Sequence, residues 1–184
     1  MPSQRICYNK NMESKLICDG KFVFENKTIC LPISLDIPNE LNFEGNAFVK
    51  NIFLHVSLVC IGKIIEKYNI SISDFENKII NDFCEFSKNN EIKEVKYTNN
   101  FKLALKKDKK TIVVMCDVLN LNKFFELINK KYNLNIEYPT LHVTLYTLPG
   151  KLGIFLVDSN DIKQYTKNIT NPINNDIISL RKSE

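Results

Sequence analysis

The chain has 184 residues, of which 44% are hydrophobic and 25% are charged, and it contains only 5 glycines and 6 prolines. This composition excludes a disordered or low-complexity chain, because such chains lack the apolar surface that offsets the entropy lost on folding. The longest nearly uncharged apolar run, residues 52–62, is about half of the roughly 20 residues that a membrane-spanning helix needs. We therefore expect one folded domain with no membrane partner.

The formal net charge is +4, and almost all of the positive charge is lysine, since the arginines are Arg5 and Arg181 alone. Proteins that read guanine or grip an RNA backbone rely on the planar fork of arginine. The charge balance therefore disfavours a sequence-reading nucleic-acid-binding protein, and it is compatible with a small anionic substrate.

The six cysteines form no Cys-x-x-Cys pair, and the chain has only two histidines. These residues offer no zinc-ligand spacing, so we expect neither a metal nor another cofactor. The N-terminal residues also lack the basic-then-apolar pattern of an export signal. We therefore expect reduced, mostly buried thiols in a cytoplasmic protein.

Strands dominate the first part of the expected fold. Residues 1–20 show no clear period and are expected to form a loosely attached start. Apolar stretches at 22–24 and 29–35 predict short strands. Residues 47–65 predict a longer strand region that ends in a turn at Gly62–Lys63.

A helix is expected over residues 73–88. Ser73 and Glu76 have the spacing of a capping box, in which each side chain bonds the backbone amide of the other residue. Behind this box, aromatic and aliphatic residues recur at helical spacing: Phe75, Ile79, Phe83 and Phe86.

The second half repeats this order. Residues 101–105 and 111–118 flank the lysine-rich segment 106–110, which predicts a β-hairpin whose tip is either a solvated turn or a phosphate-binding patch. A helix is expected over 121–132, with lysines in its last turn.

The last part of the chain predicts strands at 138–148 and 153–157, and then a short helix that Asp158 caps. The tail at 168–184 is expected to be partly frayed.

Strands, helix, hairpin, helix and strands in this order predict an α+β fold of two similar halves, because the paired strands are close in sequence. We expect a single domain over residues 1–184, with a first lobe at about 21–95 and a second at about 96–160.

The two histidines stand in nearly the same pentapeptide: residues 54–58 read LHVSL and residues 141–145 read LHVTL. Alternate side chains of a strand share a face, so His55 and Ser57 point one way, as do His142 and Thr144. The leucines and valines between them point into the core. Each strand therefore presents an imidazole and a hydroxyl side by side.

The pattern apolar-His-apolar-[Ser/Thr]-apolar, repeated 87 residues apart, resembles the two-histidine (2H) phosphoesterase superfamily. That superfamily includes RNA 2′,3′-cyclic phosphodiesterases, once called 2′-5′ RNA ligases, and 2′,5′-oligoadenylate phosphodiesterases. The run at 58–62, with its glycine, is also similar to the stretch that often follows the first motif there. The resemblance covers roughly residues 48–158. It implies two pseudo-symmetric lobes facing a central groove, and a nucleotide, oligonucleotide or RNA-end substrate.

The residue types agree with phosphodiester hydrolysis. The pKa of histidine, near 6.5, leaves both protonation states accessible at neutral pH, so His55 and His142 are expected to act as general base and general acid. Ser57 and Thr144 are expected to donate hydrogen bonds to the non-bridging phosphate oxygens. No acidic cluster accompanies them, so we expect a metal-independent phosphodiesterase.

Some assignments stay open at this point, including which histidine is the base. Tyr146 is expected on the strand face of Thr144, either touching the substrate or as a half-buried strand residue. Lys63 and Lys151 follow the motif strands, and each is either a positive group at the groove or an exposed turn residue. The alternative functions are a non-catalytic RNA- or nucleotide-binding module using the same groove, and a protein-interaction domain.

Overall fold

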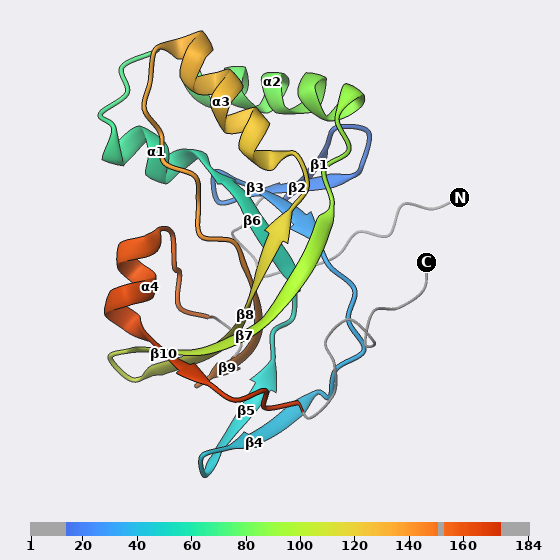
Figure 1. The fold of residues 1–184 in the computed structure, drawn as a ribbon, viewed down its shortest axis with the longest axis vertical. Coiled ribbons are helices and arrows are strands. Elements are labelled where there is room, and N and C mark those ends of the chain that lie inside the picture. Colours follow the sequence, from blue (N-terminus) through green and yellow to red (C-terminus); the bar gives the residue numbers. More distant parts are fainter. Residues whose placement is uncertain (1–13, 151–152, 174–184) are drawn as a thin grey trace.

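The computed structural model describes residues 14–150 and 153–173. These residues form ten strands in one antiparallel sheet and four helices, which confirms the expected α+β class (Figure 1). The strands are β1 Lys15–Ile17, β2 Phe22–Glu25, β3 Thr28–Pro32, β4 Glu40–Phe43, β5 Asn46–Lys50, β6 His55–Cys60, β7 Glu94–Lys106, β8 Lys109–Val118, β9 His142–Leu148 and β10 Thr166–Ile169. The helices are α1 Ile61–Lys67, α2 Phe75–Asn89, α3 Leu121–Tyr132 and α4 Ser159–Tyr165.

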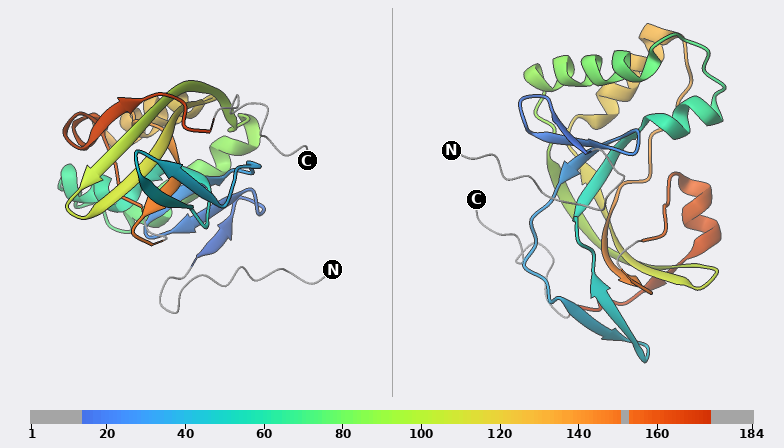
Figure 2. Two further views of the ribbon diagram at one scale, coloured as in Figure 1. Left: turned by 90° about the horizontal axis from the view of Figure 1, so that it is seen from below. Right: turned by 180° about the vertical axis from the view of Figure 1, so that it is seen from behind.

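The strands that carry the two histidines, β6 and β9, are neighbours in the middle of the sheet. The order is β1-β2-β3-β6-β9-β8-β7-β10, so the β2–β3 hairpin adjoins β6 and the β7–β8 hairpin adjoins β9. β4 and β5 form a further hairpin, which pairs with the end of β9 through Val49 and Thr147. This hairpin lies at the end of the sheet opposite α1, α2 and α3 (Figures 1 and 2).

The helices fall into two groups. α1, α2 and α3 gather together, and their apolar sides complete a large core in which Phe83 and Phe124 are fully buried. α4 lies apart from them beside β7 and β10, where Ile162 and Tyr165 pack with Val113 in a smaller core. No helix in the described ranges has the length and apolar character needed to cross a membrane.

Most helices follow their sequence signals. α3 has the expected bounds and α2 lies within two residues of them, because apolar side chains recur along each at helical spacing. α4 begins after Asp158, whose carboxylate accepts from the amides of Asn160 and Asp161, as expected. The prediction of a capping box at Ser73 and Glu76 is wrong. The N-cap of α2 is Asp74, which has a left-handed backbone conformation and makes no side-chain capping hydrogen bond.

Two expected elements are also wrong. Gly62–Lys63 is not a turn, because both residues lie in α1, which begins directly after β6. Residues 153–157 do not form a strand, and the amide of Ile154 donates instead to the side-chain oxygen of Thr111. The lysine-tipped hairpin is confirmed, with β7 longer than expected.

The cysteines differ from the expectation of reduced thiols. Cys18 and Cys84, 66 residues apart in the chain, form a disulfide that ties the turn after β1 to α2. Cys30, Cys60 and Cys116 are buried and take no part in a disulfide. Residues 1–13 of the expected loose start lie outside the described residues, and Lys15–Ile17 belongs to the sheet, since it pairs with β2.

Candidate active site

The two histidines lie on neighbouring strands and on one face of the sheet. His55 is the first residue of β6 and His142 is the first residue of β9, and the two strands pair antiparallel through Val56 and Val143. Both valines are fully buried, so the residues on either side of them point to the opposite face. We call this opposite surface the site face; its motif residues are His55, Ser57, His142 and Thr144.

Each imidazole faces the hydroxyl of the other motif. One step from the valine pair, the register places His55 opposite Thr144 and Ser57 opposite His142. Directly opposite side chains start about 4.5–5.5 Å apart, and diagonal ones about 7–8 Å apart. The imidazoles lie on a diagonal, at a spacing that matches two groups on either side of one phosphate.

A β-bulge follows each motif at the same position. The register of β6 against β3 shifts so that Leu58 is an extra residue, and the register of β9 against β8 shifts so that Leu145 is an extra residue. Each is the residue after the motif hydroxyl, and each is fully buried. A bulge interrupts the two-residue alternation of a strand. The alternation that places the motif side chains on the site face therefore ends at Ser57 and Thr144.

Both imidazoles are held by the same kind of backbone contact. Nδ1 of His55 lies 2.9 Å from the carbonyl oxygen of Phe53, and Nδ1 of His142 lies 3.0 Å from that of Thr140. A carbonyl oxygen only accepts, so Nδ1 is the donor and carries a proton in each ring. Nε2 is therefore the atom that each histidine has left to take up or release a proton. The ring of Phe53 also stacks on His55, with the centroids 4.6 Å apart.

The surroundings favour neutral imidazoles. Burial lowers the pKa of His55 below its ordinary value, against the opposing effect of the Phe53 carbonyl. Burial also lowers the pKa of His142; the Thr140 carbonyl opposes this, and the charge of His55 adds to it. The two rings therefore lie close enough to influence each other's protonation.

The two hydroxyls have different neighbours. Ser57 forms a hydrogen bond with the thiol of Cys30, whose pKa is raised to about 12 by burial in spite of this bond. Thr144 lies under Gly153, where a Cβ atom would come within 3.1 Å of the threonine methyl carbon. A side chain at position 153 would therefore press on Thr144, so the glycine allows the close packing of segment 153–157.

Tyr146 does not share the face of Thr144, so that expectation is wrong. Its side chain is fully buried in the large core, and its hydroxyl donates to the carbonyl oxygen of Pro38 at 3.1 Å. The bulge at Leu145 explains this placement, because it turns Tyr146 to the core side and leaves Thr147 next to Thr144 beside Gly153.

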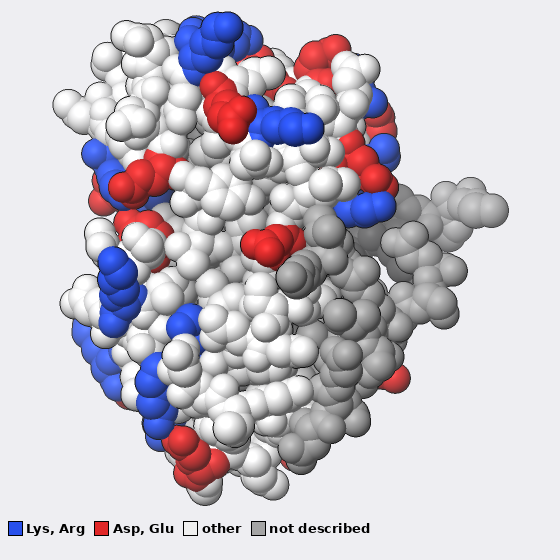
Figure 3. All heavy atoms as spheres, in the orientation of Figure 1, with Lys and Arg blue, Asp and Glu red and all other residues white. Residues whose placement is uncertain are grey.

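The two candidate lysines were expected just past the motif strands. Lys63 lies on α1 and pairs with Glu66 at 2.7 Å, and Lys151 lies outside the described residues. At the hairpin tip, Lys106 lies over the ring of Tyr165 at 4.3 Å. Figure 3 shows lysines along one edge of the molecule, over α4 and this hairpin. The solvated-turn and phosphate-patch interpretations of the tip both stay predictions.

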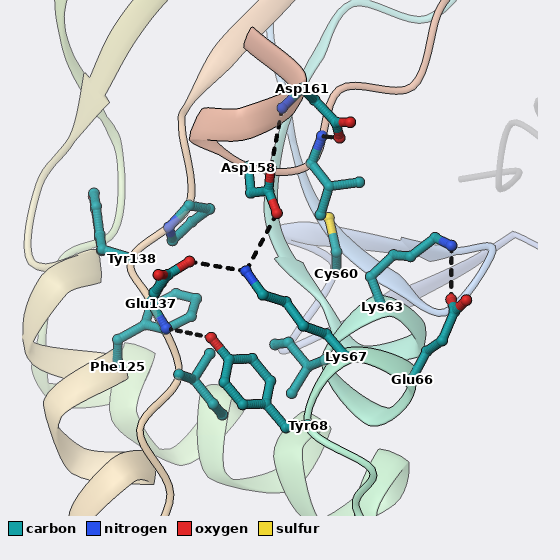
Figure 4. A pocket seen from close by; sticks show the side chains of 14 residues that line it. Cys60, Lys63, Glu66, Lys67, Tyr68, Phe125, Glu137, Tyr138, Asp158 and Asp161 are labelled. Atoms are coloured by element: carbon teal, nitrogen blue, oxygen red, sulfur yellow. Dashed lines mark hydrogen bonds and ion pairs between the residues drawn. The ribbon is translucent and has the colours of Figure 1, made fainter. Parts of the chain in front are cut away.

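A pocket of about 300 Å³ lies next to the site face, between α1, the segment that leads into β9, and the start of α4 (Figure 4). Lys67 bridges these three walls, since its Nζ lies 2.8 Å from Glu137 and 3.2 Å from Asp158. The hydroxyl of Tyr68 accepts from the amide of Glu137 at 2.9 Å. No local sequence pattern indicates this pocket, because its walls come from three distant segments.

The roles of the Phe53 and Thr140 carbonyls are likewise absent from any sequence pattern, because every residue has a backbone carbonyl. Their one signal is their position two residues before each histidine. Within residues 14–150 and 153–173, no three side chains of the metal-binding types gather as a ligand set. Comparisons of the chain with family models, curated proteins and solved structures gave no match.

Proposed function

We propose that the protein is a metal-independent phosphoesterase that hydrolyses a cyclic or 2′-linked phosphodiester in nucleotides, oligonucleotide signals or RNA ends. The observation that carries this proposal is the matched pair of imidazoles, both held at Nδ1 by a carbonyl two residues earlier. A single histidine in this arrangement would fit a structural role. Two of them on one face, each opposite a hydroxyl, fit general acid–base catalysis.

In the proposed reaction, Nε2 of one neutral histidine removes a proton from the attacking water. The water oxygen bonds to phosphorus, and the bond from phosphorus to the leaving oxygen breaks. The other histidine, protonated on both nitrogens, gives its Nε2 proton to that leaving oxygen. Because the two imidazoles supply both proton transfers, this mechanism needs no metal ion.

Ser57 and Thr144 have the position to stabilise the charge that builds on the non-bridging oxygens. Each lies directly opposite one histidine and two residues along the strand from the other. Hydrogen bonds aimed at charge that develops in the transition state lower the barrier more than they strengthen substrate binding.

The order of the sheet supports the two-lobed arrangement that the resemblance implies. From its centre outward, one side runs β6-β3-β2-β1 and the other runs β9-β8-β7-β10. On each side the motif strand adjoins a hairpin and carries a bulge after its hydroxyl residue. We propose that these halves are the two pseudo-symmetric lobes, with the histidines at their junction.

The test is hydrolysis of a panel of cyclic and linear phosphodiesters in the presence of EDTA, with products separated by chromatography. We expect turnover of 2′,3′-cyclic or 2′,5′-linked substrates by the wild type, and its loss in both His55→Ala and His142→Ala. Tyr146→Phe is the control: it removes a hydroxyl close to the motif in sequence but buried in the core, so turnover should persist. Turnover that survives either histidine change, or that depends strictly on added magnesium or manganese, would contradict the proposal.

A further inference from the structure

The pocket beside α1 lies at the end of the site face. Cys60, which lines it, is three residues beyond Ser57 on β6, and Pro139 is three residues before His142. Three residues of chain span at most about 10 Å. Val157, on the third wall, ends segment 153–157, whose first residue, Gly153, lies over Thr144. The pocket is therefore on the same side of the sheet as the histidine pair, about one nucleoside away from it.

The walls of the pocket suit a flat ring. Tyr138 is 45% exposed and stands edge-on to Phe125, with ring centroids 5.7 Å apart. The other apolar lining residues are Ile64, Ile136, Pro139 and Val157. A volume of about 300 Å³ is at the small end for ligand pockets, so it fits one nucleobase and excludes a longer nucleotide chain.

The charges of the pocket disfavour a second phosphate. Its two lysines, Lys63 and Lys67, are both paired with carboxylates (Figure 4). The pocket also has two more acidic groups than basic ones; the four carboxylates are Glu66, Glu137, Asp158 and Asp161. A neutral ring that donates hydrogen bonds fits this lining, and a further anion does not.

Glu137 is the carboxylate best placed to read such a ring. It neighbours Tyr138. Lys67 pairs with its carboxylate, and the Tyr68 hydroxyl accepts from its backbone amide. Its Oε2 accepts from Lys67, whereas its Oε1 has no donor among the residues that the structure describes. A carboxylate accepts from the exocyclic amino group of cytosine, and uracil carries an oxygen there instead.

We propose that this pocket is the nucleobase subsite of the enzyme and that Glu137 selects a base with an exocyclic amino group over uracil. This inference rests on the proposed hydrolysis at the histidine pair. Cytosine and uracil have nearly the same shape, so a preference between them reports the hydrogen bond alone.

The experiment compares 2′,3′-cyclic CMP with 2′,3′-cyclic UMP for turnover, and cytidine 3′-phosphate with uridine 3′-phosphate for binding by titration calorimetry. We expect the wild type to favour the cytidine ligands about tenfold, the value of one hydrogen bond to a charged group at a partly exposed site. Glu137→Gln should remove the preference, because its amide can turn to donate to uracil. Glu66→Gln, on the same pocket but paired with Lys63, is the matched control and should keep it.

The outcomes separate the two proposals. Turnover of both cyclic nucleotides at equal rates would overturn the subsite and leave the hydrolysis standing. Tighter binding of cytidine 3′-phosphate that depends on Glu137, without any turnover, would support the subsite and overturn the hydrolysis. Equal or undetectable binding of the two 3′-phosphates would overturn the subsite, as would a preference that Glu137→Gln leaves intact.

Discussion

Breaking the disulfide between Cys18 and Cys84 is expected to remove a large part of the protein's stability. The bond closes a loop of 66 residues, and cross-linking a loop of that length removes enough entropy from the unfolded chain to be worth about 4 kcal/mol at 25 °C. Domains of this size are stable by roughly 5–15 kcal/mol, so Cys84→Ser should unfold at a much lower urea concentration than the wild type.

The assay is urea unfolding followed by tyrosine fluorescence, with and without a reductant. Cys116→Ser is the matched control, because Cys116 is buried and takes no part in a disulfide. Any stability that this variant loses should therefore be the same with and without the reductant. A titration of thiols in the unfolded, unreduced protein should find at least two fewer than the six cysteines of the chain. Six titratable thiols, or identical midpoints for wild type and Cys84→Ser, would refute the reasoning.

Three further predictions concern the histidine pair. The pKa values of His55 and His142 are both lowered, so the pH profile of kcat/KM should be a bell centred below pH 6.5. A bell centred above pH 7 would contradict this. Because these pKa values are lower in the folded chain, the unfolded chain binds more protons below about pH 6.5, so stability should decrease as the pH is lowered through that range. The decrease should be smaller in the doubly substituted His55→Gln, His142→Gln protein, and equal pH slopes in calorimetry would contradict this. Ser57→Ala and Thr144→Ala should each lower kcat by about 10-fold to 100-fold in steady-state assays and raise KM by less. The expected loss is smaller than in a closed active site, because water can reach this one. An unchanged kcat would remove the hydroxyls from the mechanism.

The sequence was sufficient for what depends on local periodicity. Alternation along LHVSL and LHVTL placed the imidazoles and hydroxyls on one surface, because nothing interrupts the strand within each motif. The helix over 121–132 was equally local, since Leu121, Phe124 and Ile128 recur on one side.

What failed depends on contacts that no local pattern records. Tyr146 reached the core because a bulge at Leu145 adds one residue, and the bulge comes from the pairing with β8. The disulfide joins segments that the fold brings together, and the apolar neighbours of Cys84 gave no sign of a partner. The pocket likewise exists only after α1 and α4 meet the segment before β9.

The central claim is that two identically held imidazoles share one phosphate, and nitrogen-15 NMR of labelled histidines tests it most directly. Near pH 7.5, both rings of the free protein should be neutral with the proton on Nδ1, as the carbonyls of Phe53 and Thr140 require. Adding a nucleoside 3′-phosphate should then shift the Nε2 signals of His55 and His142 together, along a single binding curve. A proton on Nε2 in either free ring, or a phosphate that shifts only one of the two rings, would contradict the claim.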